Sequence, residues 1–161
     1  MTHEAIISSG EFLVDNGINE FKMNLSIPFF EEEVEVFAFN ISRSYSEGEI
    51  NLVTEIVNEL LNFPVNNKTW LKREIYNHYL ACISNMDYSH GLHGDDLFFK
   101  NQQHFKIFTE DDAYEKIKLK MIWFDVSYIG FRYFNLEYSC PWEKEHGIKI
   151  GIMNGEFDSM Q

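Results

Sequence analysis

A segment near the C-terminal end of the sequence, residues 141–147, combines residue types that can take part in chemistry. It reads Pro-Trp-Glu-Lys-Glu-His-Gly, so an indole, two carboxylates and an imidazole lie in one short stretch. A carboxylate that is hydrogen-bonded to an imidazole sets the tautomer of the ring and raises its basicity. Glu145 and His146 are therefore candidates for an acid–base pair.

The same segment also suits a structural role, to which we give more weight than to a binding or catalytic role. In this role the segment is a tight connection, in which Pro141 presets its own φ angle and Gly147 adopts a backbone conformation that other residues avoid. A buried histidine bonded to the backbone is also commoner than a catalytic one. We therefore expect Trp142 to be buried and His146 to be hydrogen-bonded within the protein, and we assign no catalytic residue. The structural motif consists of Trp142, Glu143, Glu145, His146 and Gly147.

A second segment carries two histidines and two aspartates. His90 and His93 are three residues apart and are followed by Asp95 and Asp96, a set of side chains that can hold zinc. A structural zinc site needs four ligands at defined spacing, and neither a cysteine pair nor a second histidine pair completes one. His104 can contribute only if the chain folds back. We favour a polar loop punctuated by glycine, and we expect neither a bound metal nor a cofactor.

Other motifs that would indicate catalysis are missing from the sequence. The chain has no Gly-x-Ser-x-Gly motif for a nucleophilic serine and no glycine-rich phosphate-binding loop. Cys82 and Cys140 are expected to be reduced, and Cys82, on an apolar helix face, is expected to be buried and inert. We therefore expect a protein that is not an enzyme. The competing hypothesis is a small metal-dependent hydrolase or ligand-binding enzyme that uses His90, His93 and His146.

The net charge of the chain distinguishes between classes of partner. Its 161 residues include 13 basic and 26 acidic side chains, which gives a formal net charge of −13. Such a surface repels nucleic acid and anionic membranes and attracts a basic protein, although solubility alone also accounts for the acidic excess. Candidate contacts with a basic partner lie in three acidic runs, which are Glu31, Glu32 and Glu33, then Asp95 and Asp96, and finally Glu110, Asp111 and Asp112.

Length and composition predict a soluble cytoplasmic protein with a packed core. Apolar residues make up 45% of the chain and aromatic residues 16%, which argues against disorder. We see no signal-peptide pattern at the start, and no apolar run approaches the ~20 residues that span a bilayer. The chain has the length of one domain, and we expect a single domain over residues 1–161.

Residue periodicity predicts the elements that must position these side chains. Alternation of apolar and polar residues, or a short apolar run, predicts strands at residues 20–30, 34–41, 119–128, 131–138 and 148–153. Apolar residues at helical spacing, together with capping signals, predict helices at residues 46–64, 67–83 and 109–116.

This order of elements predicts an α+β fold, with helices packed on one face of a mostly antiparallel sheet and a C-terminal β-meander. Residues 85–108 fit neither period and are expected to form a long loop or insert. At the C-terminal end, Asn154 and Gly155 are a strong signal for a hairpin turn. In the alternating stretch 148–152, the isoleucines should face the core and Lys149 should face solvent.

The segment 140–148, Cys-Pro-Trp-Glu-Lys-Glu-His-Gly-Ile, resembles the Trp-[Asp/Glu]-x-Glu-His-Gly-[hydrophobic] signature of an uncharacterised family of small bacterial domains. Related sequences often resemble immunity proteins of bacterial polymorphic toxin systems. The likeness extends more weakly over residues 20–158. It departs at Glu143, where Asp is frequent, and by a histidine-containing insert at residues 85–108. The resemblance implies an α+β fold, a bacterial cytosolic location and a non-enzymatic binding role, and it transfers no catalytic residues.

The leading hypothesis is therefore a non-enzymatic interaction protein, specifically an immunity protein that binds and neutralises a cognate toxin. The resemblance supplies the class of protein, and the charge of −13 supports it independently. Many toxins that attack nucleic acid are basic, and electrostatic steering speeds the capture of a basic partner by an acidic protein. We expect a basic protein toxin as the partner, and we expect no binding to nucleic acid or membranes.

Overall fold

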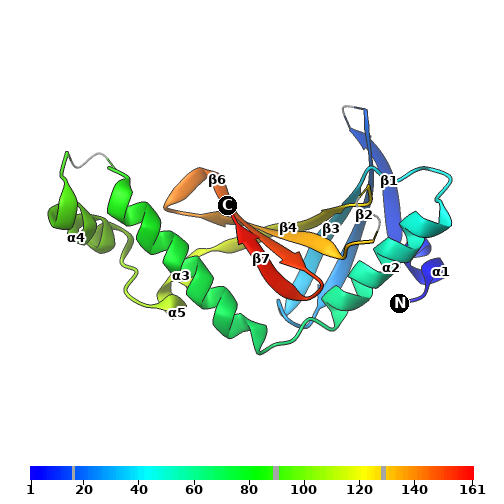
Figure 1. Ribbon diagram of the computed structural model, residues 1–161, viewed down its shortest axis with the longest axis horizontal. Helices are drawn as coiled ribbons and strands as arrows, with labels where there is room; N and C mark the ends of the chain where they lie inside the picture. The colour runs from blue at the N-terminus through cyan, green and yellow to red at the C-terminus, as the bar shows by residue number, and fades with distance from the viewer. Residues whose placement is uncertain (16, 89–90, 128–129) are drawn as a thin grey trace. The chain divides into compact units, whose positions relative to one another are not determined.

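Helices and strands follow one another along the chain in the order that Figure 1 shows for the computed structural model. The structure describes all residues of the chain except 16, 89–90 and 128–129. The helices of the described part are α1 (His3–Ser9), α2 (Glu47–Leu61), α3 (Asn67–Asn85), α4 (Gly94–Phe105) and α5 (Glu110–Lys116). The strands of the described part are β1 (Gly10–Asp15), β2 (Ile18–Ile27), β3 (Glu32–Phe39), β4 (Lys118–Asp125), β5 (Tyr133–Cys140), β6 (Glu143–Met153) and β7 (Glu156–Met160).

The strands form one sheet whose order follows the chain from β1 to β7. The pairs β1–β2, β2–β3 and β6–β7 are antiparallel, whereas β3 and β4 are parallel, with Val36 opposite Ile122. A parallel pair needs a long connection, and the chain between β3 and β4 holds the helices α2 to α5. The predicted α+β class and the mostly antiparallel sheet are thus confirmed.

Contacts between residues divide the chain into two compact units, each with its own buried core. Unit 1 comprises Met1–Val65, Lys120–Glu137 and Lys149–Gln161. Unit 2 comprises Asn66–Leu119 and Tyr138–Ile148.

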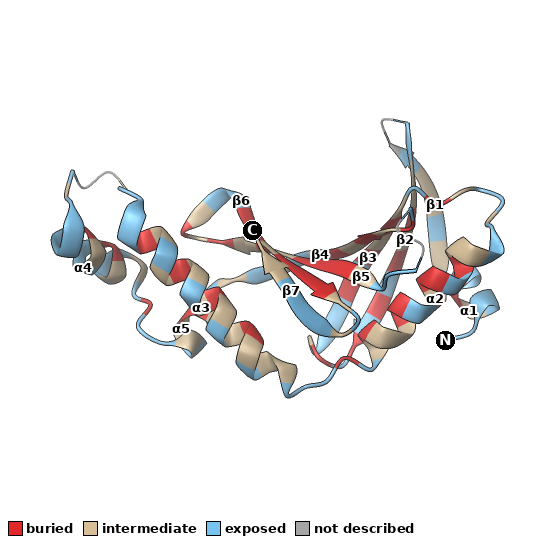
Figure 2. Cartoon of the chain, in the orientation of Figure 1, coloured by how far each residue is buried: buried red, intermediate tan, exposed pale blue. Residues whose placement is uncertain are grey.

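The core of unit 1 includes one face of strand β2 and the helix α2 that packs on it. Along β2, every second residue from Phe21 to Ile27 is buried, as expected for a strand with one face against a core. The buried residues of α2 recur at helical spacing (Figure 2), and they are Ile50, Leu52, Val53, Ile56, Val57 and Leu60. This stripe confirms the predicted amphipathic helix.

The start of α2 is held by the predicted capping box. The Ser46 side chain accepts a hydrogen bond from the backbone of Glu49, and the Glu49 carboxylate accepts one from the backbone of Ser46. The same carboxylate accepts hydrogen bonds from the backbone and the hydroxyl of Ser42. Burial alone would raise the pKa of Glu49, but these hydrogen bonds outweigh it and lower the pKa to about 2.

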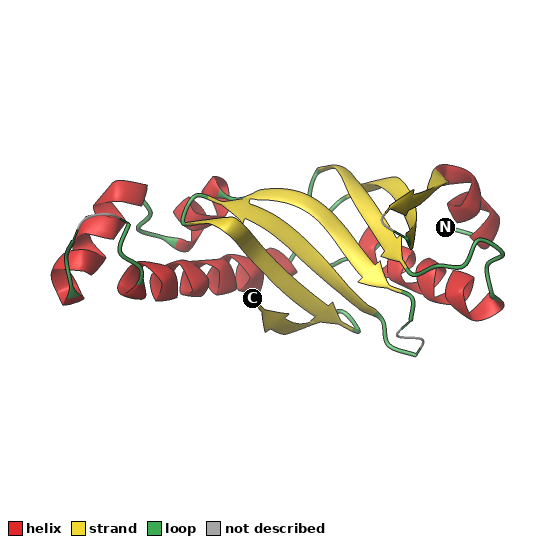
Figure 3. Ribbon diagram, turned by 90° about the horizontal axis from the view of Figure 1, so that it is seen from above, coloured by secondary structure: helices red, strands yellow, loops and turns green. Residues whose placement is uncertain are grey.

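The C-terminal strands form the predicted meander, which is visible from above in Figure 3. The three isoleucines of β6 at positions 148, 150 and 152 are fully buried. Asn154 and Gly155 have φ angles of 52° and 82° and form the hairpin turn, after which β7 pairs with β6. Lys149 is only partly exposed, because its side chain extends over Trp123, with Nζ 5.2 Å from the ring centre.

Unit 2 is built around helix α3, which contacts both α4 and α5. Its buried residues are Leu71, Ile75, Tyr79 and Ile83, which confirms the predicted stripe with the exception of the half-buried Cys82. The segment 85–108, which we expected to be a long loop, contains the 12-residue helix α4. Few apolar side chains face inward from α4, and a buried amide, Asn101, fixes it by donating to the carbonyls of Ile83 and Met86.

Candidate functional site

The segment 141–147 holds its tryptophan in the core of unit 2, as predicted. Trp142 is 1% exposed, its carbonyl accepts a hydrogen bond from the Tyr88 hydroxyl at 2.7 Å, and its ring meets that of Tyr79 edge-on at 5.2 Å. Its indole Nε1 lies 3.2 Å from Nδ1 of His78 and donates a hydrogen bond to it. The predicted burial of Trp142 is therefore confirmed.

The rest of this segment is a strand, not the tight connection that we expected. Pro141 and Trp142 form a turn, and β6 begins directly after it at Glu143. Gly147 has a φ angle of 70°, and a Cβ atom at this position would lie 2.2 Å from the carbonyl oxygen of Tyr138. The glycine is thus required both by its conformation and by the close approach of the neighbouring chain.

The prediction that His146 is hydrogen-bonded inside the protein is wrong. Its side chain is 83% exposed and lies 4.0 Å from the Glu145 carboxylate, which is 87% exposed. The polar start of β6 is exposed, and its first buried residue is Gly147. The interaction between two exposed side chains at this distance is weakened by water.

Three titratable side chains lie near Trp142 in unit 2, and they are the half-buried His78 and Cys82 and the buried Cys140. Burial raises the pKa of the Cys82 thiol, and it raises that of Cys140 to about 11. Burial also lowers the pKa of His78, against a smaller opposing effect of Glu143. Both thiols are therefore protonated at neutral pH and are weak nucleophiles.

The histidines considered for zinc do not come together in the described part of the chain. His90 lies outside the described residues. His93 is the residue before α4, and His104 is in the last turn of that helix, so about 16 Å of helix separates them. Among the described residues, no group of three or more His, Cys, Asp and Glu side chains is placed to hold a metal ion.

Two carboxylates of the acidic run 110–112 form hydrogen bonds or an ion pair with other residues of unit 2. The Asp112 carboxylate accepts hydrogen bonds from the backbone of Phe108 and Thr109, each at 2.9 Å, and so caps α5. The first of these hydrogen bonds contributes most to a lowered pKa of Asp112. Asp111 forms an ion pair with Lys72 at 2.6 Å. These two carboxylates are engaged within the protein. In the other run, Glu31 lies in the exposed turn between β2 and β3, and Glu32 and Glu33 are the exposed first residues of β3.

The acidic pair Asp95 and Asp96 lies next to an exposed aromatic residue. Both aspartates are exposed in the first turn of α4, where negative charge interacts favourably with the helix dipole. Phe99 follows three and four residues later, on the same side of the helix, and is 61% exposed. We refer to Asp95, Asp96 and Phe99 as the α4 surface.

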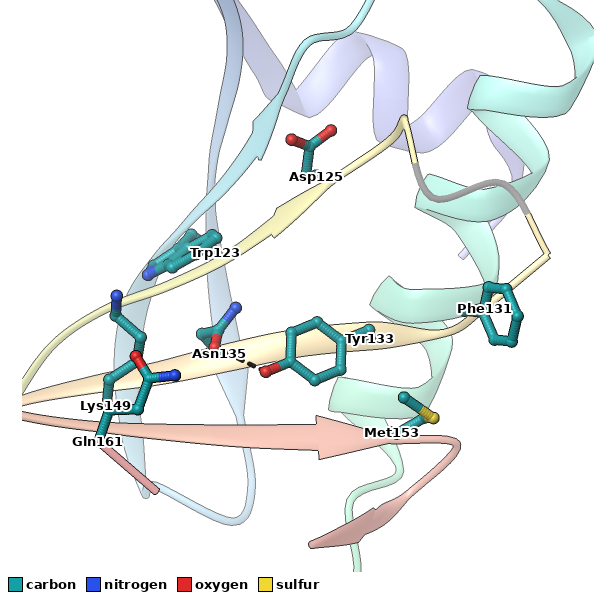
Figure 4. Close-up of a pocket in the computed structure, with 8 residues that line it drawn as sticks. All are labelled: Trp123, Asp125, Phe131, Tyr133, Asn135, Lys149, Met153 and Gln161. Atoms are coloured by element: carbon teal, nitrogen blue, oxygen red, sulfur yellow. Dashed lines mark hydrogen bonds between the residues drawn. The ribbon is translucent and has the colours of Figure 1, made fainter. Parts of the chain in front are cut away.

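A pocket on the sheet of unit 1 was not predicted from the sequence. It has a volume of about 520 Å³ and lies on the face of β4, β5 and β6 opposite the buried isoleucines (Figure 4). A half-buried tryptophan, a tyrosine, a lysine and a fully buried asparagine meet there. The lining residues are Trp123, Asp125, Phe131, Tyr133, Asn135, Lys149, Met153 and Gln161.

The tyrosine of this pocket is placed by three neighbouring strands. The Tyr133 hydroxyl of β5 lies 3.3 Å from Oδ1 of Asn135 and 3.4 Å from Oγ of Ser159 on β7. It can reach β7 because Gly151 of β6 has no side chain, and a Cβ atom there would lie 2.3 Å from the hydroxyl. The alternation of Tyr133 and Asn135 with buried Phe134 is the signal in the sequence that marks a second, polar face of this strand.

Comparison with known proteins assigns most of the chain to one family profile. Residues 9–160 match the family described as Domain of unknown function (DUF6985). No curated protein and no solved structure matches the chain. Among the described residues, none of the helices combines the length and the apolar character that crossing a membrane requires.

Proposed function

We propose that this chain, which belongs to the family Domain of unknown function (DUF6985), acts by binding another protein. The partner that we propose is a basic protein toxin, which this chain neutralises in the manner of an immunity protein of a polymorphic toxin system. The proposal builds on the resemblance of residues 140–148 to sequences related to such proteins, and on the charge and surface of the chain.

The α4 surface is the observation that carries the proposal. It combines two exposed carboxylates, Asp95 and Asp96, with a 61% exposed aromatic ring, Phe99. Protein interfaces are typically centred on aromatic side chains that fill a pocket of the partner, surrounded by a polar rim. A basic protein with an apolar pocket bordered by lysine or arginine is complementary to this arrangement.

The overall charge supports the same type of partner. A net charge of −13 creates an attractive field for a basic protein and raises the rate of encounter more than it slows dissociation. The exposed carboxylates of Glu31, Glu32 and Glu33 add to this field from unit 1. Charges outside the contact steer the partner, whereas Asp95 and Asp96 would lie in the contact itself.

The buried chemistry of unit 2 favours binding over catalysis. Cys82 and Cys140 are held as protonated thiols by burial. His146 and Glu145 are 83% and 87% exposed and lie 4.0 Å apart, so water weakens the interaction between them. Neither group has the surroundings that activate a catalytic residue.

The test is recovery and neutralisation of the partner. The tagged chain would be purified from its native host, the protein that is retained would be identified, and its growth inhibition would be measured with and without this chain. We expect a basic protein whose toxicity is suppressed at a one-to-one ratio. An acidic partner, or a partner whose activity is unaffected by binding, would contradict the proposal.

The α4 surface is tested by substitutions on this pair of proteins. Phe99→Ala should weaken binding by about 2 kcal/mol, mainly through faster dissociation, because it removes a central aromatic contact. Asp96→Lys should lower the association rate more than Glu145→Lys, which changes the charge equally at a different exposed position of unit 2. Equal effects of the two charge reversals would show that α4 is not the contact.

A further inference from the structure

The sheet face of unit 1 carries a buried hydrogen-bond donor that the protein itself does not use. Asn135 is 2% exposed, and its Oδ1 accepts a hydrogen bond from the Tyr133 hydroxyl at 3.3 Å. Its Nδ2 has no hydrogen-bond partner among the described residues. A buried donor without an acceptor is costly, so such groups in folded proteins are paired with protein, water or a ligand. Figure 4 shows this amide within the pocket, between Trp123 and Tyr133.

A positive charge is held over the same strand. Lys149 lies on β6 and Trp123 on β4, and β5, which carries Asn135, runs between them in the sheet. The lysine Nζ is 5.2 Å from the tryptophan ring centre, so its side chain extends across β5. Its backbone is fixed by two hydrogen bonds with Gln161, at 2.8 and 2.9 Å. In the described part of the chain, no carboxylate lies within 4.0 Å of this ammonium group.

The walls of the pocket suit a flat, apolar group. Trp123 and Tyr133 provide aromatic surface, and Phe131 and Met153 extend the apolar lining. Tyr133 is positioned by Ser159, so its ring is fixed before a ligand arrives. A volume of about 520 Å³ is within the range of pockets that take small molecules.

The acidic residue of the pocket is already engaged. The two carboxylate oxygens of Asp125 accept hydrogen bonds from the Asn40 side chain at 2.7 Å and from the Ser127 backbone at 2.8 Å. Asp125 therefore does not call for a cationic ligand. The two groups that lack an acceptor, Nδ2 of Asn135 and Nζ of Lys149, are both donors.

We propose that this pocket binds a small aromatic carboxylate. The ring of the ligand lies against Trp123 and Tyr133, and its carboxylate accepts hydrogen bonds from Asn135 and Lys149. A charge-assisted hydrogen bond is stronger than a neutral one, and aromatic contact adds to it, so an aromatic acid satisfies the pocket better than an aliphatic acid or a neutral ring. This site is separate from the α4 surface and does not depend on a protein partner.

Binding is tested by titrating the full chain with three probes, benzoate, 4-hydroxybenzoate and indole-3-carboxylate, and with the corresponding neutral primary amides. Two-dimensional ¹H–¹⁵N NMR reports the side-chain amide of Asn135 and the backbone of β5 directly. We expect at least one acid to bind saturably, to shift the Asn135 amide resonances, and to bind about tenfold more tightly than its amide. Lys149→Met should weaken the binding of that acid by about tenfold. Lys118→Met, at an exposed position of β4, should leave its binding unchanged.

Several outcomes would overturn the proposal. If no acid shifts the Asn135 resonances at millimolar concentration, the pocket is not a site for this class of ligand. If an acid and its amide bind equally well, or if Lys149→Met has no effect, the carboxylate is not recognised as proposed. Because Lys149 is partly exposed, its substitution is compatible with folding, and the unchanged spectrum of the free variant away from the pocket would verify this.

Discussion

The indole Nε1 of Trp142 donates a hydrogen bond to Nδ1 of His78 across 3.2 Å, which ties the turn before β6 to helix α3. The acceptor role of Nδ1 requires a neutral ring with its proton on Nε2. Burial keeps His78 neutral by lowering its pKa, so the hydrogen bond and the protonation state support each other. This pair is the centre of the aromatic core of unit 2, and two predictions concern it.

Truncation of the tryptophan should strongly destabilise the protein. Trp142→Ala removes a 1% exposed indole and leaves Nδ1 of His78 without its donor, so we expect a loss of about 3–5 kcal/mol in the free energy of unfolding. Phe99→Ala, an aromatic truncation at a 61% exposed position, should change it by less than about 1 kcal/mol. Denaturant unfolding measures the free energy of unfolding of both variants. Equal midpoints for wild type and Trp142→Ala would show that this tryptophan is not a core residue.

The half-buried His78 should make the free energy of unfolding sensitive to mild acid. The pKa of His78 is lowered from 6.5 by burial, so below pH 6.5 the unfolded chain binds a proton that the folded chain does not. The stabilisation is therefore complete above pH 6.5 and is lost as the pH falls toward the lowered pKa, by at most about 1.4 kcal/mol per pH unit.

The control for this effect is a substitution that keeps a hydrogen-bond acceptor for the Trp142 indole but removes the titratable imidazole of His78. In His78→Gln the amide oxygen can still accept from Trp142, and the free energy of unfolding should depend less steeply on pH between 6.5 and 5 than in the wild type. His146→Gln, at an 83% exposed position, should keep the wild-type dependence. The same slope in all three proteins would exclude His78 as the cause.

Periodic patterns in the sequence predicted the parts of the fold in which buried residues recur at the regular spacing of a strand or a helix. The isoleucines of β6 and the stripe of α2 are such cases, because each apolar residue occupies the position that its period assigns. The start of β6 was mistaken for a tight connection because Glu143 to His146 are polar on both faces. A strand that extends beyond the core has no alternation to reveal it.

Helix α4 and the sheet pocket show what short-range patterns cannot predict. The fixation of α4 depends on Asn101, a polar residue whose partners are carbonyls 15 and 18 residues earlier. The pocket depends on strands β4, β5 and β6, so Trp123, Asn135 and Lys149 meet only when the sheet forms. The short N-terminal elements α1 and β1 were also missed.

The Glu49 carboxylate should stabilise the start of α2 over a wide pH range. Its pKa is about 2 in the folded protein and 4.5 in the reference state, so its contribution is complete above pH 4.5 and is lost as the pH falls toward 2. Glu49→Gln should lower the free energy of unfolding at neutral pH by about 1 kcal/mol, whereas Glu55→Gln, exposed on the same helix, should have little effect. Thermal unfolding of both variants at pH 7 measures the difference, and matching curves would rule out the cap as a stabilising contact.

Two glycines with similar backbone conformations should respond differently to alanine. Gly147 and Gly17 have φ angles of 70° and 83°, so alanine is strained at both positions and should cost about 1 kcal/mol from backbone conformation alone. At Gly147 the added Cβ would also lie 2.2 Å from the carbonyl oxygen of Tyr138, whereas at Gly17 no atom of the described, non-adjacent residues would lie within 4 Å of it. A contact of 2.2 Å can be relieved only by moving the β5 backbone, so Gly147→Ala should be the more destabilising by at least about 1 kcal/mol. Denaturant unfolding of the two variants under one condition gives this difference directly. Equal losses would mean that conformation, and not the close approach of β5, explains the glycine at position 147.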